Sequence, residues 1–254
     1  MKIVSFGKSD VGKKREKNED SFLVDESIGL YVVADGMGGH LGGEYASKIA
    51  VKTIQEILRK FRDEPEAMMA EGHSKAGDPV LELKQAIRIA SQRIYKEAIR
   101  EPNLRGMGTT VVALLIRDQK GYLANVGDSR GYLIRNPEIQ QLTVDHSLVS
   151  EQLQAGFITL EEVKHHRLKN IITRSVGFQE DVETDLVVRE LEEGDQFLLC
   201  SDGLTNLVPD DEIQKLVSKG KSSNPKSACE KLIQLANQRG GDDNVTTVIV
   251  SVQP

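Results

Sequence analysis

YVVADGMGGHLGGE, residues 31–44, joins an apolar run to a carboxylate and then to a glycine-rich segment. The run Tyr31-Val32-Val33-Ala34 is apolar throughout and ends at a charged residue, so it predicts a buried strand. Asp35 follows this strand directly, and we therefore expect its side chain at the rim of a sheet. A rigid strand that ends in a carboxylate beside a flexible backbone indicates either a turn or a ligand-binding site.

The same arrangement recurs along the chain. FLLCSDG (197–203) repeats the strand that ends in Asp-Gly, and YLANVGDSRGYL (122–133) contains Asp128 between two expected strands. In NEDSFLV (18–24) and GGDDNVTTVIV (240–250) the acidic residues come just before a strand. For any single site an ordinary Asp-Gly turn explains the pattern. Together the sites predict a group of carboxylates at strand ends, although spacing alone does not bring them together in space.

Bound cations would explain such a group if it does converge. Neighbouring carboxylates repel one another and lose hydration when buried, and cations relieve both effects. All-oxygen ligands without Cys favour Mg²⁺ or Mn²⁺ over structural zinc. Glycines allow the backbone to approach the metals, and two such cations about 3.5–4 Å apart can activate a water and hold phosphate oxygens.

The periodicity predicts an α+β domain with largely antiparallel sheets. Helical patterns span about Gly43 to Phe61, Pro79 to Ile99, and Pro225 to Gln238 with Asn224 as the N-cap. The segment 62–78 between the first two is expected to be a polar, mobile loop. Strand patterns cover 109–117, 121–127, 131–135, 184–191, 195–201 and 244–252. Without strict βαβ alternation and without a linker, we expect one domain over residues 1–254.

Composition narrows the classes of partner. The 254 residues include 28% charged and 39% hydrophobic residues, and the net charge of −6 argues against nucleic acids and anionic membranes as partners. Cys200 and Cys229 show no pairing pattern, and Cys200 lies in an apolar run. With no long apolar segment near the N-terminus or elsewhere, we expect a cytoplasmic protein without a signal peptide or membrane span.

The motifs together resemble the protein phosphatase 2C (PPM) family of metal-dependent Ser/Thr phosphatases, in particular its compact bacterial members. They occur in the family's order over almost the whole chain: REKNED (15–20), VVADGMGGH (32–40), GMGTT (106–110), VGDSRGYL (126–133), DHSLV (145–149), LLCSDGLTN (198–206) and GGDDNVT (240–246). The resemblance implies a β-sandwich of two antiparallel sheets flanked by helix pairs. It also implies two Mn²⁺ or Mg²⁺ ions in a cleft at one end.

Roles for individual residues follow from this resemblance. Asp35 matches the carboxylate that bridges both metals, and Gly36 matches a carbonyl ligand. Asp202 and Asp243 match ligands of the other metal, and Asp20 contributes through metal-bound water. Asp128, with Asp202, matches the site of a weaker third ion. Arg15 matches the arginine that binds the substrate phosphate, and residues from about His146 to Val176 match a mobile flap beside the cleft.

The general acid is less well defined by the motifs. Animal members carry a His directly after the Asp-Gly, where this chain has Met37, so His40 is the bacterial-type candidate. For the remaining polar residues we expect structural roles: an ion pair for Arg130, a turn or flap anchor for His146, and no nucleophile at Ser129, which lacks a nucleophile-elbow sequence.

The resemblance implies hydrolysis of phosphoserine and phosphothreonine on proteins by a metal-activated water. Phosphoproteins are then the substrates, a Ser/Thr kinase is the expected opposing partner, and the protein is expected to be a monomer. Two alternatives remain: a non-catalytic regulator of the same fold that binds phosphoproteins, and a hydrolase of small phosphate esters. Regulators of this kind typically lose metal carboxylates, whereas all of them are present here.

Overall fold

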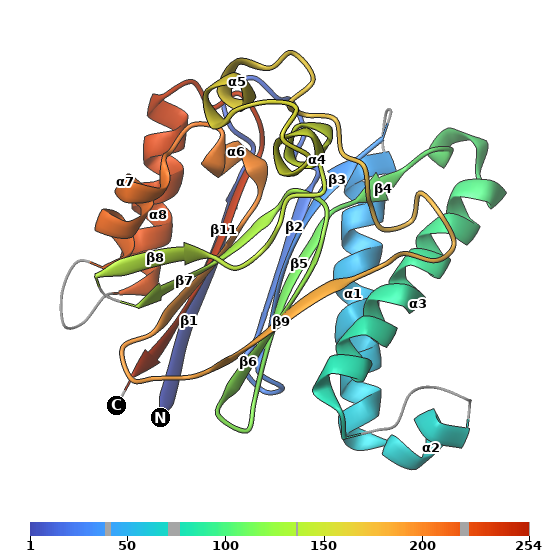
Figure 1. Cartoon of the computed structure of the whole chain (residues 1–254). Coiled ribbons are helices and arrows are strands. Elements are labelled where there is room, and N and C mark those ends of the chain that lie inside the picture. The colour runs from blue at the N-terminus through green and yellow to red at the C-terminus, as the bar shows by residue number, and fades with distance from the viewer. Residues whose placement is uncertain (39–41, 71–76, 136, 219–223, 254) are drawn as a thin grey trace.

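Two antiparallel β-sheets lie face to face, and helices cover the outer face of each one (Figure 1). The computed structural model describes residues 1–38, 42–70, 77–135, 137–218 and 224–253. The layers therefore follow the order helix, sheet, sheet, helix. This architecture confirms the β-sandwich expected from the sequence.

All strand pairs in both sheets are antiparallel. The first sheet has the order β1-β11-β10-β7-β8, with β1 Lys2–Asp10, β11 Val245–Gln253, β10 Gln196–Cys200, β7 Arg130–Arg135 and β8 Glu138–Gln141. The second has the order β2-β3-β5-β6-β9, with β2 Asp20–Asp25, β3 Leu30–Met37, β5 Val111–Arg117, β6 Lys120–Val126 and β9 Asp185–Glu190. The short β4, Gly108–Thr109, pairs with β3.

Helices α1 (Gly42–Asp63) and α3 (Pro79–Arg100) pack on the second sheet, whereas α7 (Asp210–Val217) and α8 (Pro225–Gln238) pack on the first. Asn224 caps α8 as expected, because its side chain accepts a hydrogen bond from the Lys226 amide. The shorter helices are α2 (Pro65–Ala70), α4 (Leu148–Gln154), α5 (Leu160–His165) and α6 (Asp202–Thr205), with one 3₁₀ turn at Pro102–Leu104.

The four layers explain the apolar run that precedes Asp35. Leu30, Val32 and Ala34 point into the core between the second sheet and its helices, while Tyr31 and Val33 point into the core between the sheets. Both faces of β3 are buried, so its sequence shows no alternation of apolar and polar residues. Because β3 is paired on both sides, by β2 and β5, its end holds the backbone of Asp35 firmly in place.

The expectation for residues 62–78 was wrong in part. Helix α1 continues to Asp63, and α2 occupies Pro65–Ala70, where a loop was expected. Pro65 suits the first position of α2, and Met68, only 2% exposed, anchors it to the core of α1 and α3. The polar composition of the segment gave no clear helical pattern, although Met68 is buried against the core. Residues 71–76 lie outside the described part of the chain.

Other elements were not predicted from the sequence: β1, β8 and the short helices α4 to α7. Within the described ranges, no helix combines the length and the apolar composition required to cross a bilayer. The segment 146–176 contains α4 and α5, which lie together over one end of the sandwich (Figure 1).

Candidate active site

The antiparallel pairing brings the predicted carboxylates to one edge of the sandwich. Asp20 begins β2 and Asp35 lies near the end of β3, and these two residues are direct partners in the register of the two strands. In the other sheet Asp202 follows β10 and Asp243 precedes β11, which pair with each other. Asp128 lies in the turn between β6 and β7. The five carboxylates are thus held by four different strand ends and one turn.

The pKa values of these groups reflect their closeness to one another. Burial, together with the neighbouring carboxylates, raises the pKa of Asp20 to about 7. The pKa of Asp128 is also raised to about 7, by burial and then by Asp202. Burial and then the other four carboxylates raise the pKa of Asp35 well above its usual value, and burial and Asp243 raise that of Asp202. Full ionisation of this group therefore requires positive charge.

Asp20 has one oxygen held and one oxygen free. The hydroxyls of Ser201 and Thr246 donate to Oδ2 at 2.8 and 2.7 Å. Oδ1 is buried and has no hydrogen-bond partner among the described residues. A buried, unpaired carboxylate oxygen is unfavourable on its own, and it is the kind of atom that a cation or an ordered water satisfies.

Two glycines allow the backbone to close around this edge. A Cβ atom on Gly36 would lie 2.0 Å from the Gly43 carbonyl oxygen, at the start of α1. A Cβ atom on Gly203 would lie 2.0 Å from the Asn244 carbonyl oxygen, just before β11. Both glycines follow a candidate ligand directly, so the Asp-Gly pairs are required by close approach of backbone segments and not only by a turn.

Arg15 stands beside the carboxylates. Its guanidinium donates to Oδ2 of Asp243 at 2.7 Å, and its side chain is 53% exposed. It therefore lies at the open side of the acidic group, with Asp243 fixing its position. This location is compatible with the predicted phosphate contact, for which a planar guanidinium is well suited.

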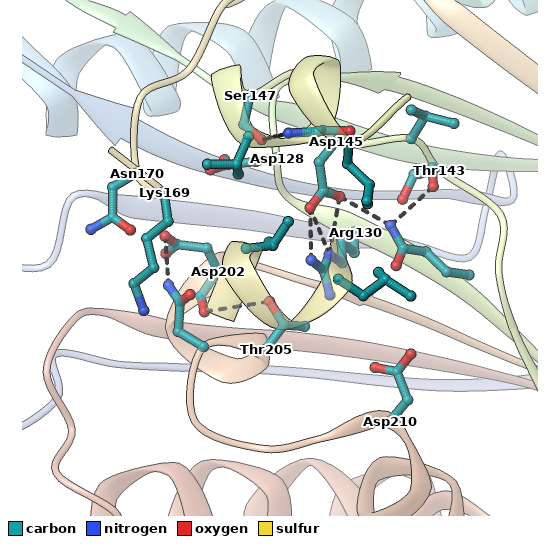
Figure 2. A pocket seen from close by; sticks show the side chains of 18 of the residues that line it. Asp128, Arg130, Thr143, Asp145, Ser147, Lys169, Asn170, Asp202, Thr205 and Asp210 are labelled. Carbon is teal, nitrogen blue, oxygen red and sulfur yellow. Dashed lines mark hydrogen bonds and ion pairs between the residues drawn. The ribbon is translucent and has the colours of Figure 1, made fainter. Parts of the chain in front are cut away.

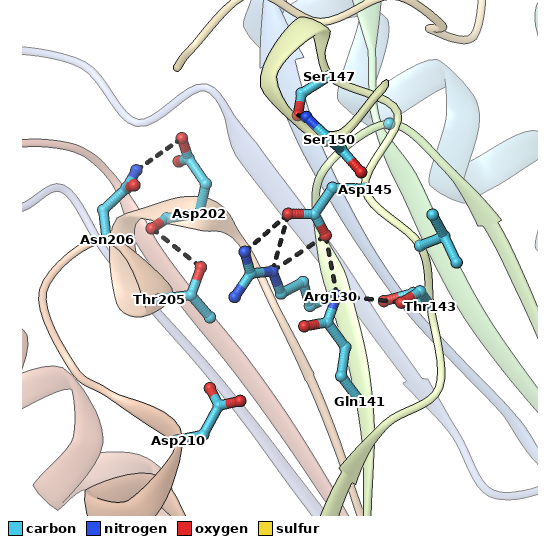
Figure 3. Close-up of polar contacts among 12 residues, drawn as sticks. Arg130, Gln141, Thr143, Asp145, Ser147, Ser150, Asp202, Thr205, Asn206 and Asp210 are labelled. Carbon is cyan, nitrogen blue, oxygen red and sulfur yellow. Dashed lines mark hydrogen bonds and ion pairs between the residues drawn. The ribbon is translucent and has the colours of Figure 1, made fainter. Parts of the chain in front are cut away.

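A cavity of about 770 Å³ opens next to Asp128 and Asp202 (Figure 2). Its walls come from the β6–β7 turn, α6, the start of α7 and the segment with α4 and α5, which contributes Lys169 and Asn170. Arg130, which also lines the cavity, donates to both carboxylate oxygens of Asp145, as expected for a structural ion pair (Figure 3). The side chain of Asp202 accepts a hydrogen bond from Asn206 at 2.9 Å (Figure 3).

The site fits divalent cations in its chemistry but not as a closed cage. Its donors are oxygens, it includes an orphaned Asp20 oxygen, and its pKa values indicate a need for positive charge. In the parts of the chain that are described, no three His, Cys, Asp or Glu side chains stand in an arrangement that would hold a metal ion as they are. The ligand roles therefore stay predictions, as does the role of the Gly36 carbonyl. His40 lies outside the described residues.

Sequence reasoning did not identify the hydroxyls that support the carboxylates. Ser201 and Thr246 hold Asp20, and Thr110 accepts a hydrogen bond from the Asp35 amide. Thr110 also pairs with the buried hydroxyl of Ser129 at 2.7 Å, which agrees with a structural role for that serine. Each of these hydroxyl residues lies inside one of the family motifs, and this position was the only feature of the sequence that could have indicated its supporting role.

Comparisons with known proteins agree with the fold and with the motifs. The family model described as protein phosphatase 2C matches residues 7–245. A serine/threonine phosphatase stp from Listeria monocytogenes is 38% identical over 246 residues, which cover 96% of this chain and 93% of that protein.

The solved structures that match include the Mycobacterium tuberculosis serine/threonine phosphatase PstP, with a TM-score of 0.87, 35% identity and 99% of both chains covered. A structure of the PstP catalytic domain in complex with two manganese ions has a TM-score of 0.85, also with 35% identity and 99% of both chains covered.

Proposed function

The chain belongs to the protein phosphatase 2C family, and from this membership we propose that it is a metal-dependent phosphatase that hydrolyses phosphoserine and phosphothreonine on proteins. The observation that carries the proposal is the group of five carboxylates at one sheet edge, whose pKa values are raised by burial and by mutual repulsion. A group of this kind is not expected in a purely structural part of a sheet, since it destabilises the fold unless cations bind.

Asp35 would bridge two Mn²⁺ or Mg²⁺ ions, with the Gly36 carbonyl as a further ligand. Asp202 and Asp243 would hold the second ion, Asp20 would contribute through water, and Asp128 with Asp202 would take a weaker third ion. The ions would supply positive charge for the phosphate oxygens and an activated water as the nucleophile. The two manganese ions of the related PstP structure support this proposal.

The protein's own residues supply position and charge. The hydroxyls of Ser201 and Thr246 orient Asp20, because they hold Oδ2 and leave Oδ1 free. Arg15, held by Asp243, would bind the phosphate of the substrate. The adjoining cavity is large enough for peptide side chains next to the phosphorylated residue. His40 is the proposed general acid.

The partners follow from this activity. Phosphorylated proteins are the substrates, and we propose an opposing Ser/Thr kinase, a monomeric state and a single catalytic domain over residues 1–254. A cytoplasmic location is supported by the free, buried thiols of Cys200 and Cys229.

A phosphopeptide assay tests the proposal. Phosphate release from a phosphothreonine peptide is measured with Mn²⁺, with Mg²⁺ and with a chelator in parallel. We expect release with a metal and none with the chelator. No release under any metal condition, or release that the chelator does not suppress, contradicts the proposal.

A further inference from the structure

The turn that carries Asp128 is held by one buried side chain from a distant part of the chain. Gly127 makes hydrogen bonds with His146 in both directions: its N–H donates to Nδ1 of the imidazole at 3.0 Å, and its carbonyl oxygen accepts from the His146 N–H at 3.0 Å. Gly127 has φ +102°, and a Cβ atom there would lie 2.6 Å from Thr110. Position 127, just before Asp128, therefore requires glycine, and two hydrogen bonds with His146 hold it in place.

The same histidine closes the base of the segment that covers the cavity. The carbonyl oxygen of His146 accepts from the Thr173 N–H at 2.9 Å, and the Leu148 N–H donates in turn to the carbonyl oxygen of Ile171 at 2.9 Å. His146 is thus the residue at which the base of the α4–α5 segment meets the turn of Asp128. Ser147, the next residue, lines the cavity together with Asp128 (Figure 2).

The contacts define the tautomer of His146. Because the Gly127 N–H donates to Nδ1, this nitrogen must be the acceptor, and Nε2 then carries the proton. Nε2 lies 3.2 Å from Oδ2 of Asp185 and donates to it. Arg174, 3.1 Å from Nε2, cannot also donate to this nitrogen, and it forms ion pairs with Oδ1 of Asp185 at 2.9 Å and with Glu183 at 3.4 Å. The two ring nitrogens thus serve different neighbours.

We propose that His146 is a positioning residue of the phosphatase: its Nδ1 fixes the Gly127–Asp128 turn, so that Asp128 is presented to the cavity and coupled to the base of the α4–α5 segment. The inner contact, to Gly127, carries this role. The outer contact, to Asp185, orients the ring. The effect on turnover rests on the proposed phosphatase activity, and the effect on Mn²⁺ uptake rests only on the weaker ion proposed at Asp128 and Asp202.

Two substitutions separate the contacts. The side-chain oxygen of Asn reaches about as far as Nδ1, so His146→Asn keeps an acceptor for Gly127 and loses the contact to Asp185. The longer Gln reaches about as far as Nε2, so His146→Gln keeps a donor for Asp185 and loses the acceptor for Gly127. Asp128→Ala is the reference for complete loss of the carboxylate. Thermal unfolding of each variant checks that the fold is retained.

The experiment is a double-mutant cycle between His146→Gln and Asp128→Ala, followed by kcat on a phosphopeptide and by calorimetric titration with Mn²⁺. Loss of one hydrogen bond lowers an equilibrium or rate by about three- to tenfold. We expect His146→Gln to lower both kcat and the affinity of the weaker Mn²⁺ site by this factor, whereas His146→Asn should retain most of both. When Asp128 is already Ala, His146→Gln should cause no further loss.

Equal losses in the Asn and Gln variants, or additive losses in the cycle, overturn the proposal and leave His146 as a packing residue. If the wild-type protein releases no phosphate, the proposed function fails. The Mn²⁺ titrations then still decide the inference, since a His146→Gln variant that takes up Mn²⁺ as the wild type does refutes it. If the His146→Gln variant does not fold, His146→Asn takes its place in the experiment. A His146→Asn variant that loses as much kcat and Mn²⁺ uptake as Asp128→Ala then overturns the proposal.

Discussion

At the scale of single residues, the site depends on carboxylates that are unfavourable where they lie. Asp35 is half-buried beside the four other candidate ligands, and the pKa values of Asp20 and Asp128 are both raised to about 7. Removing one charge should therefore have opposite effects on stability and on function. This opposition separates a cation-binding group from an ordinary turn, where the loss of an Asp only weakens the local structure.

We predict that Asp35→Asn and Asp202→Asn each lower turnover by more than about a hundredfold, because each removes a charge that the proposed metal site requires. In the presence of a chelator the same variants should unfold at a higher temperature than the wild type, because less like charge is buried. Steady-state kinetics and thermal unfolding measure both effects. Asp242→Asn is the control, since Asp242 is exposed and pairs with Lys14. A folded Asp35→Asn variant with most of its metal-dependent activity would rule out the two-metal assignment.

Arg15 gives a second prediction at this scale. A charge-assisted hydrogen bond contributes about 1.5–3 kcal/mol, so Arg15→Ala should lower kcat/KM by about ten- to a hundredfold, mainly through KM. Inhibition by free phosphate should weaken in parallel, while Mn²⁺ uptake remains, because Arg15 is not a ligand.

Lys14→Ala provides the matched control for this prediction. Lys14 is the neighbouring cation and pairs with the neighbouring carboxylate, Asp242, at 2.6 Å. The two variants thus remove similar charge from adjacent positions. If both variants change KM equally, or neither does, Arg15 is an ordinary surface residue.

At the scale of elements, ion pairs hold the strands to the helices that cover them. Asp25 ends β2 and is almost fully buried, and its carboxylate accepts hydrogen bonds from Ser27 and from Gln55 and Arg59 of α1. Burial alone would raise its pKa, but these donors outweigh burial and lower the pKa to about 2. The interaction ties the far end of the β2–β3 pair to α1, and so stabilises the strands whose other end carries Asp20 and Asp35.

We predict that Asp25→Asn lowers the free energy of unfolding by about 1.5–3 kcal/mol near neutral pH. A carboxyl whose pKa is lowered in the folded state stabilises the fold above its ordinary pKa of about 4, and this contribution is lost as the pH falls through about 2. The difference between variant and wild type should therefore shrink across this range. Urea unfolding at several pH values measures it, with Asp63→Asn, in an exposed pair with Arg62, as a control that should not differ from the wild type. A difference that does not depend on pH contradicts the assignment to the Asp25 charge.

At the scale of the whole molecule, the candidate metal site joins both sheets. Asp20 and Asp35 come from one sheet, Asp202 and Asp243 flank strands of the other, and Ser201 and Thr246 donate across the sandwich to Asp20. Ligand binding at this edge should therefore stabilise the sandwich as a unit and not one element of it.

We predict that Mn²⁺ raises the thermal unfolding midpoint of the metal-free protein. At a free concentration of 100 times Kd, the stabilisation is about 2.7 kcal/mol, which corresponds to roughly 5–11 °C for a chain of this size. Differential scanning calorimetry with and without Mn²⁺ measures the shift, and Asp202→Asn should lose most of it. An equal shift in that variant would show that Mn²⁺ binds elsewhere.

The sequence by itself determined much of this protein. The positions of the long helices and of most strands follow from periodicity, and the breaks at the Asp-Gly pairs follow from backbone preferences that act over a few residues. The order of the motifs identified the family and the candidate ligands. The loop expected at 62–78 failed at α2, because one buried methionine, Met68, docks a charged segment that has no strong helical pattern of its own.

Only the tertiary structure decided between a set of turns and one site. The contacts that assemble the edge are long-range: Thr246 lies 226 residues from the Asp20 that it holds, and Asp243 lies 228 residues from Arg15. Sequence spacing carries no information about such pairs. The antiparallel registers of β2 with β3 and of β10 with β11 align the strand ends within each sheet, and the packing of the two sheets brings Thr246 to Asp20. Burial and repulsion, which raise the pKa values of the carboxylates and create their need for cations, exist only once the two sheets have packed.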